Sequence, residues 1–154
     1  MTGHTFRATT AWQAEGDFAA GRYSRVHVWR FDGGVSVPAS ASPTNVPPPY
    51  SRDDAVDPEE AFVASLSSCH MLWFLYLAHK AGFTIISYED EAEGTMGRIE
   101  RGRQAFTRVV LRPRIVFDGR TPDKTELDDL HHRAHNLCFI ANSVKSEIVV
   151  ESRD

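Results

Sequence analysis

The chain has 154 residues, 42% of them hydrophobic and 25% charged, which is typical of one globular domain with a substantial core. Its formal net charge is −4 and it has no run of lysine and arginine, which argues against nucleic acid or anionic lipid as a partner. The polar N-terminus lacks the apolar segment and cleavage site of a secretory signal. We therefore expect a single domain over residues 1–154, located in the cytoplasm.

Alternating side chains predict strands at residues 5–13 and 23–31 in the N-terminal part of the chain. An Asp-Gly-Gly turn follows at residues 32–34 and leads into a third short strand at residues 35–37. Because glycine tolerates the positive φ that tight hairpin turns require, the last two strands are predicted to form a hairpin.

A proline-rich loop precedes a long helix. The loop is expected at residues 38–57, because each of its five prolines removes a backbone donor and restricts the preceding residue. Asp57 can cap the helix and Pro58 suits its first position, whereas Lys80 and Gly82 mark its end. The expected helix has about 24 residues and a length of roughly 36 Å at 1.5 Å per residue.

Most of this helix is uncharged. Residues 61–78 form a run of 18 residues without formal charge, which reaches the length of a membrane span. Three serines and His70 interrupt the run, and no basic cluster sets an orientation, so we interpret it as a core helix with no membrane partner. A monomer of this size covers such a helix with difficulty, which predicts a homodimer.

The C-terminal half adds three strands and one helix. Strands are expected at residues 84–93 and 105–117 around a turn region at 94–102, and a last strand at 146–151. A second helix is predicted to open at Thr121-Pro122. The order of strands, helix, strands, helix and strand indicates an α+β fold.

The two cysteines are Cys69, inside the long helix, and Cys138, at the end of the second helix. A reducing compartment argues against a structural disulfide and leaves catalysis, redox sensing, metal binding or core filling. A cysteine that reduces peroxide must be a thiolate, and Cys69 lies too far inside its helix for the helix dipole to lower its pKa. A cation must come from elsewhere, and arginine is the better choice because it stays charged when buried.

The candidate cations are Arg22, Arg25, Arg52 and His70. Glu59 could hold an arginine, although on spacing alone it reads as a carboxylate that stabilises the helix start. A second thiol could trap a sulfenic acid at Cys69 as a disulfide, but the residues taken in isolation favour two unrelated core cysteines.

Two segments together resemble one known family. The segments PEEAFVASLSSCHMLWFLYLAHKAGF and LHHRAHNLCFIANSVKSEI resemble the OsmC/Ohr family of osmotically inducible and organic-hydroperoxide-resistance proteins. YSRVHVWRFDGG, SYEDEAEG and VLRPRIVF extend the resemblance, which favours the OsmC-like branch. The resemblance implies an intertwined homodimer with two central helices between sheets. It also implies thiol-dependent reduction of organic hydroperoxides, and more weakly of hydrogen peroxide, to alcohols without a metal or organic cofactor.

By motif position the resemblance assigns roles to four residues. Cys69 matches the peroxidatic cysteine, Cys138 the resolving cysteine, and Glu59 the glutamate that holds an activating arginine. Arg25 is our first choice for that arginine and Arg22 the second. Phe139 replaces the proline that follows the second cysteine in the Ohr pattern. A small dithiol or a lipoyl-bearing protein is the expected reductant, by analogy only.

Two other hypotheses remain open from the sequence. A metal site could use His131, His132, His135 and Cys138, although histidines near a helix C-terminus are more often solvated or capping. Alternatively, the same fold could serve a non-catalytic redox-sensing or small-molecule-binding protein whose cysteines pair reversibly. Rapid turnover of peroxide with a dithiol would exclude that second alternative.

Overall fold

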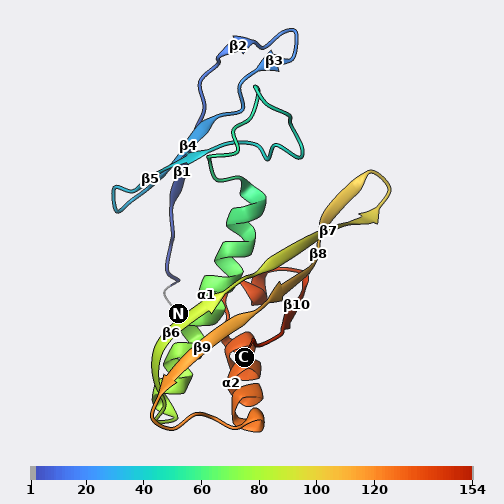
Figure 1. Cartoon of the computed structure of the whole chain (residues 1–154). Helices are drawn as coiled ribbons and strands as arrows, with labels where there is room; N and C mark the ends of the chain where they lie inside the picture. Colours follow the sequence, from blue (N-terminus) through green and yellow to red (C-terminus); the bar gives the residue numbers. More distant parts are fainter. Residues whose placement is uncertain (1–2, 154) are drawn as a thin grey trace. The chain divides into compact units, whose positions relative to one another are not determined.

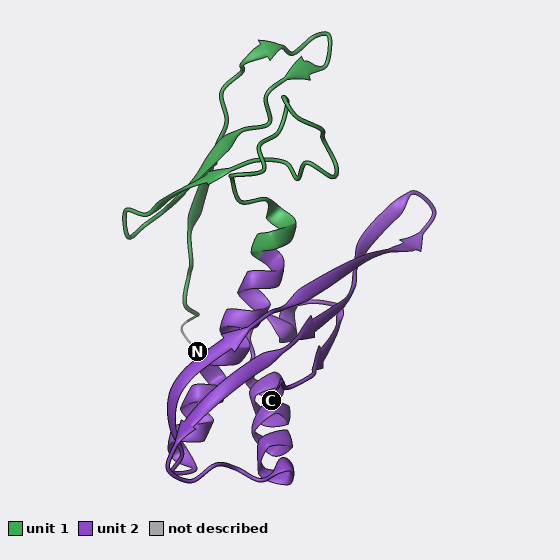
Figure 2. Ribbon diagram, viewed as in Figure 1, with its two compact units in different colours: residues 1–61 green, residues 62–154 purple. Residues whose placement is uncertain are grey.

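The computed structural model describes residues 3–153, which form two compact units that divide between residues 61 and 62 (Figure 2). Two long helices and ten strands are present among these residues, so the predicted α+β class is confirmed (Figure 1). The prediction of one domain over the whole chain stays a prediction.

The first unit is built around a three-stranded antiparallel sheet. Its strands are β1 (Ala8–Ala11), β4 (His27–Phe31) and β5 (Ser36–Ala39), in the order β1-β4-β5. The predicted hairpin is confirmed, and Gly34 adopts a φ of 91° in its turn. The expected strand at residues 23–31 is interrupted, because β3 (Arg22–Tyr23) pairs instead with β2 (Gly16–Asp17).

The long helix is confirmed, and the proline-rich loop is confirmed except at its start, because β5 extends through Pro38 to Ala39. Helix α1 spans Pro58–Lys80. Asp57 caps it: its Oδ1 accepts a hydrogen bond of 2.8 Å from the Glu60 N–H, and the Glu60 carboxylate accepts one from the Asp57 N–H. The helix ends where Gly82, with a φ of 84°, donates its N–H to the carbonyl of His79.

The strands of the second unit form two sheets. One pairs β6 (Thr84–Asp90) with β9 (Pro113–Asp118), and the other has the order β10-β8-β7. In that second sheet β7 (Glu93–Glu100) is antiparallel to β8 (Arg103–Leu111), whereas β10 (Glu147–Val150) is parallel to it. The last strand was predicted correctly.

Two expectations for these sheets were wrong. Residues 94–102 are mostly strand β7 rather than a turn region. Gly94 belongs there because a Cβ atom would come within 2.7 Å of the Phe106 and Val63 side chains, and at Gly97 within 2.8 Å of Thr107. The expected strand at 105–117 is divided at residue 112 into β8 and β9, which pair with different neighbours.

Helix α2 (Lys124–Leu137) packs against α1 and the β6–β9 sheet. It starts slightly later than predicted, because Asp123 and Glu126 form a reciprocal capping box. A short 3₁₀ helix, η1 (Ala141–Ser143), follows it. The shared core joins residues of α1, α2 and the residue just before β6: Phe74, Leu77, Ala78, Phe83, Leu130 and Ala134.

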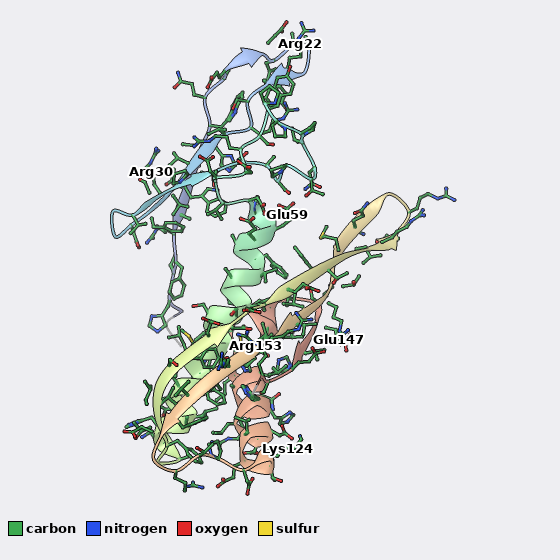
Figure 3. The ribbon with its side chains drawn as sticks, viewed as in Figure 1. Arg22, Arg30, Glu59, Lys124, Glu147 and Arg153 are labelled. Atoms are coloured by element: carbon green, nitrogen blue, oxygen red, sulfur yellow. The ribbon has the colours of Figure 1, made fainter. Side chains whose placement is uncertain are left out.

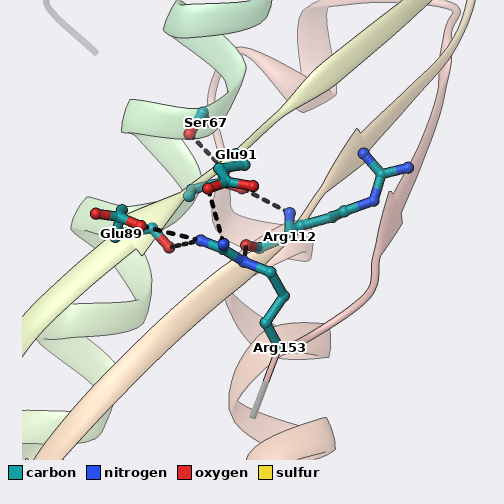
Figure 4. Close-up of polar contacts among 6 residues, drawn as sticks. Ser67, Glu89, Glu91, Arg112 and Arg153 are labelled. Carbon is teal, nitrogen blue, oxygen red and sulfur yellow. Dashed lines mark hydrogen bonds and ion pairs between the residues drawn. The ribbon is translucent and has the colours of Figure 1, made fainter.

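A polar junction fixes the middle of α1 in this unit (Figure 4). The Asp90 carboxylate accepts hydrogen bonds from the Ser67 hydroxyl at 2.5 Å and from the Arg112 N–H at 2.6 Å. Arg153 donates to the Arg112 carbonyl at 2.7 Å and pairs with Glu91 at 3.0 Å. These contacts join α1 to the end of β6, the start of β9 and the C-terminal segment. Ser67, the α1 residue that takes part, lies two residues before Cys69 in the helix.

Helix α1 is long and apolar enough to cross a membrane by length and composition. This is weak evidence, because the core helix of a soluble protein passes the same test. Of its most apolar 18-residue window, 28% is buried in the single chain. Our interpretation of α1 as a core helix that a second copy covers stays a prediction.

Candidate active site

The two thiols lie close together within the second unit. Cys69 is half-buried on α1, and Cys138 is 1% exposed directly after α2; both are free thiols. The pKa of Cys138 is raised to about 11, chiefly by burial and to a smaller extent by the neighbouring Cys69 thiol. The Cys69 thiol is thus near enough to Cys138 to influence its titration.

The end of α2 holds Cys138 in place. Its extended backbone ends the helix, and its N–H donates to the His135 carbonyl at 3.3 Å. Its Sγ accepts a hydrogen bond of 3.4 Å from the Ala141 N–H, and its carbonyl accepts one of 3.0 Å from the Asn142 N–H. The sulfur is therefore fixed by the backbone of η1, as expected of a residue at a helix terminus.

An apolar cavity of about 390 Å³ opens beside Cys69. It is lined by Cys69, Leu72, Trp73, Tyr76 and Phe139. The Trp73 ring meets the Tyr76 ring edge-on at 5.8 Å and the Phe139 ring edge-on at 5.4 Å, measured between centroids. Leu72, Trp73 and Tyr76 follow Cys69 at helical spacings, so the sequence could have revealed this wall, whereas the Phe139 contact had no sequence signal.

Arg25 lies in the first unit, between β3 and β4. Its guanidinium stacks 3.6 Å from the centre of the Tyr23 ring and donates to the Tyr23 carbonyl at 2.5 Å. Its backbone N–H donates to the Tyr50 carbonyl. Arg22, the second choice, is an exposed residue of β3 that pairs with Asp17 at 3.5 Å (Figure 3). Arg52 forms a two-point contact with Asp54.

Glu59 lies in the first turn of α1 (Figure 3). Its Oε1 accepts a hydrogen bond of 3.1 Å from the Asn45 side chain, but its buried Oε2 has no partner within residues 3–153. The contact between Glu59 and Arg25 implied by the resemblance is not formed in this unit, because Arg25 is engaged by Tyr23. A buried carboxylate oxygen without a donor is costly, so Glu59 can accept a further cation.

Two buried histidines of α1 and α2 contact each other in the second unit. His70 Nε2 and His131 Nδ1 share a hydrogen bond of 3.0 Å, and His131 Nε2 is 3.1 Å from the Ser152 hydroxyl. Burial lowers the pKa of each histidine to about 4, so both are neutral near pH 7. His70 is therefore a buried core residue and not the cation that the sequence offered as a candidate, and its buried Nδ1 has no partner in the described part of the chain.

The metal hypothesis finds no support in this arrangement. His131 contacts His70 and Ser152, and its burial contradicts the expectation of a solvated or capping side chain. Among residues 3–153, no group of three or more histidine, cysteine, aspartate or glutamate side chains could hold a metal ion.

Comparison with known families decides the identity of the fold. The family model described as OsmC-like protein matches residues 51–153. The chain belongs to the OsmC-like family. This match confirms the resemblance, and it contains Glu59, Cys69 and Cys138 but not Arg25.

Solved structures of this family cover nearly the whole chain. An OsmC-like protein of unknown function from Vibrio cholerae is 48% identical, with a TM-score of 0.94 over 97% of this chain and 99% of that chain. An organic hydroperoxide resistance protein from Elizabethkingia anophelis is 24% identical, with a TM-score of 0.70 over 98% and 95%. A Bacillus subtilis organic hydroperoxide resistance protein is 18% identical, with a TM-score of 0.68 over 96% and 98%. A search of curated proteins found no match.

Proposed function

We propose that this OsmC-like protein is a thiol peroxidase that reduces organic hydroperoxides, and more weakly hydrogen peroxide, to the corresponding alcohols or water. The observation that carries the proposal is the interaction of Cys69 with Cys138 beside an apolar cavity. Family membership supports it, as do the related folds of the Elizabethkingia and Bacillus organic hydroperoxide resistance proteins.

The reaction divides into three balanced steps. The Cys69 thiolate attacks the outer peroxide oxygen, the O–O bond breaks, and the departing alkoxide takes a proton to leave as the alcohol. The resulting Cys69 sulfenic acid condenses with the Cys138 thiol, which forms a disulfide and releases water. A small dithiol or a lipoyl-type dithiol in the cytoplasm then supplies two electrons and two protons to restore both thiols.

The titration of Cys138 suits a resolving role. Its raised pKa keeps it protonated at neutral pH while Cys69 is reduced. Once the Cys69 thiolate has become a neutral sulfenic acid, its charge no longer adds to the raised pKa of Cys138, which burial, the largest cause, still maintains. Oxidation of Cys69 thus makes the thiolate form of Cys138 easier to reach at the step that requires it.

Activation of Cys69 is the part of the proposal that needs a second copy. Glu59 and Cys69 lie in the same helix, ten residues apart, so about 15 Å of helix rise separates them. The face of α1 formed by Ala64, Ser68, Leu72 and Tyr76 is exposed and uncharged, which suits helix packing in a homodimer. Within such a dimer, Arg25 held by Glu59 of one copy would stabilise the Cys69 thiolate of the other.

The deciding experiment adds one equivalent of cumene hydroperoxide to fully reduced protein. Intact-mass analysis and peptide mapping should find a disulfide between Cys69 and Cys138, and peroxide consumption should depend on an added dithiol. A disulfide without dithiol-supported turnover would instead favour the redox-sensing alternative. Thiols that remain unchanged would refute the peroxidase and favour a binding protein on the same fold.

A further inference from the structure

A second and larger cavity lies between α2 and β9. Its volume is about 710 Å³, which is within the range of small-molecule sites. Its β9 wall is apolar and is formed by Pro113, Ile115 and Phe117, and four residues at helical spacing from Lys124 to His131 form its α2 wall. None of the lining residues belongs to α1, so this cavity is separate from the α1 face that we assign to a second copy.

The cations that line this cavity already have partners. Lys124, in the first turn of α2 (Figure 3), pairs with Asp128 at 2.5 Å. The Arg153 guanidinium pairs with Glu89 at 3.4 Å and with Glu91 at 3.0 Å (Figure 4). An anion in the cavity would lose hydration and would have to compete with a carboxylate for either cation. The lining therefore favours a neutral ligand.

The polar end of the cavity is a chain of hydrogen bonds that must run in one direction. His131 Nε2 is 3.1 Å from the Ser152 hydroxyl, and His131 Nδ1 is 3.0 Å from His70 Nε2. A neutral imidazole carries a single N–H, so both histidines donate in the same sense along the chain. A chain running from Ser152 to His70 would make His70 Nδ1 a buried N–H with no acceptor among residues 3–153. Unpaired buried N–H groups are rarer than unpaired acceptors, which favours the opposite direction.

This direction leaves a free donor in the cavity. His70 donates to His131, and His131 Nε2–H donates to the Ser152 oxygen. Ser152 is exposed and lines the cavity, and its hydroxyl hydrogen has no acceptor among the residues that the structure describes. A ligand that fills the cavity must therefore bring an acceptor to Ser152.

We infer that this cavity is a binding site for a neutral, mainly apolar molecule whose carbonyl group accepts a hydrogen bond from the Ser152 hydroxyl. Ile115, Phe117 and Leu127 contact the apolar body of the ligand. A carbonyl suits the site better than an alcohol, whose own hydrogen would also need an acceptor. The inference is independent of the proposed peroxidase, because it concerns another cavity and requires neither thiol.

The first test titrates the reduced, full-length protein with three probes of similar shape. 2-Acetylnaphthalene has the carbonyl, 2-ethylnaphthalene lacks it, and 2-naphthoate carries a carboxylate instead. Proton–nitrogen NMR spectra should show saturable shifts of the Ser152 and Leu127 amides with 2-acetylnaphthalene. The dissociation constant should be at least about threefold higher for 2-ethylnaphthalene and about tenfold higher for 2-naphthoate. Equal affinity for the three probes, or shifts confined to Trp73 and Tyr76 at the other cavity, would overturn the inference.

The second test removes the donor. Ser152→Ala should weaken the binding of 2-acetylnaphthalene by about threefold to tenfold, the scale of one neutral hydrogen bond, and change that of 2-ethylnaphthalene by less than about twofold. Ser87→Ala is the matched control, since Ser87 is an exposed serine of β6 in the same unit and lies outside the cavity. An unchanged preference for the ketone, or an equal loss for both probes, would overturn the role of the Ser152 hydroxyl.

The third test changes the charge of the lining. Asp128→Asn releases Lys124 from its partner, so it should tighten the binding of 2-naphthoate by about threefold and leave that of 2-acetylnaphthalene within about twofold. Asp129→Asn is the control, because Asp129 also lies on α2 but pairs with Arg133 outside the cavity. Equal affinity of both variants for 2-naphthoate would show that the paired cations do not exclude anions, and the choice of a neutral ligand would be wrong.

Discussion

The thiols and the proposed activating groups differ in how far a single chain assembles them. Cys69 and Cys138 interact within the second unit, where the shared core of α1 and α2 and the backbone of η1 position both sulfurs. In the first unit, Arg25 stacks on Tyr23, and one buried oxygen of Glu59 has no partner among the residues described. Apolar packing completes the thiol pair within one chain, whereas Arg25 would meet its thiolate partner, Cys69, only in a second copy.

The largest expected effect tests the thiol side of this comparison. Cys69→Ser should abolish peroxide consumption, because a serine hydroxyl is not ionised at neutral pH and cannot replace the thiolate. The measurement is dithiol-dependent loss of cumene hydroperoxide, with circular dichroism to verify the fold. Activity equal to wild type would rule out Cys69 as the nucleophile.

The second prediction separates the roles of the two interacting thiols. Cys138→Ser should reduce about one equivalent of peroxide per chain and then stop, because the Cys69 sulfenic acid has no partner and is oxidised further. Mass spectrometry after excess peroxide should find sulfinic or sulfonic acid at Cys69. Sustained turnover with a dithiol and no overoxidation would show that Cys138 is not needed for resolution.

The third prediction tests the charged side of the comparison. Arg25→Ala should slow the reaction of Cys69 with peroxide on the order of a hundredfold, the scale of removing one preorganised stabilising charge. The Cys69 pKa, followed by the pH dependence of thiol alkylation, should rise. Arg22→Ala is the matched control, because Arg22 is exposed and paired with Asp17, and it should react like wild type.

The opposite result for the two arginine variants would change which arginine is assigned the activating role. If Arg22→Ala slowed the reaction and Arg25→Ala did not, the activating role would pass to Arg22. Mixing Arg25→Ala with Cys69→Ser protein would then sharpen the dimer proposal. Mixed dimers that place an intact Arg25 opposite an intact Cys69 should recover part of the activity, whereas no recovery would contradict activation across two copies.

The sequence predicted the elements that depend on local signals. Helix α1 has an acidic cap and a glycine at its end, and the hairpin after β4 has its glycine turn, so these boundaries follow from short motifs. Strand β7 was missed because Gly94 and Gly97 read as turn residues. Their actual role is to leave room for Phe106 and Thr107, which only the pairing of β7 with β8 reveals.

In the candidate site, too, some residues could be predicted from sequence motifs, whereas others depend on tertiary contacts. The family pattern identified Cys69 and Cys138, and the end of α2 was placed correctly at Cys138. The contact of His131 with His70 could not be predicted, because it depends on the rotation of α2 about its own axis. Phe139 was recognised only as a departure from a pattern, since its contact with Trp73 arises across sixty-six residues of chain.

The smallest expected effect is on stability rather than activity, and it should also distinguish the two units. His70 and His131 both lie in the second unit, and their pKa values are lowered from 6.5 to about 4 by burial. In the unfolded chain these histidines bind protons below about pH 6.5, whereas in the folded chain they bind them only below about pH 4. The free energy of unfolding therefore falls as the pH falls through this window. At pH 4.5, one such histidine corresponds to about 2 to 3 kcal/mol lost from the free energy of unfolding.

Urea unfolding of wild type at pH 7 and pH 4.5 measures this loss, with a His70→Gln/His131→Gln variant as the control. The double variant should be less stable than wild type at pH 7, because the stacked pair is lost, yet it should lose less stability on acidification. Hydrogen exchange at pH 5 should show α1 and α2 loosening before the β1-β4-β5 sheet, since the buried histidines join the two helices. An identical pH dependence in both proteins would mean that other groups, and not this pair, make the thiol-bearing unit sensitive to acid.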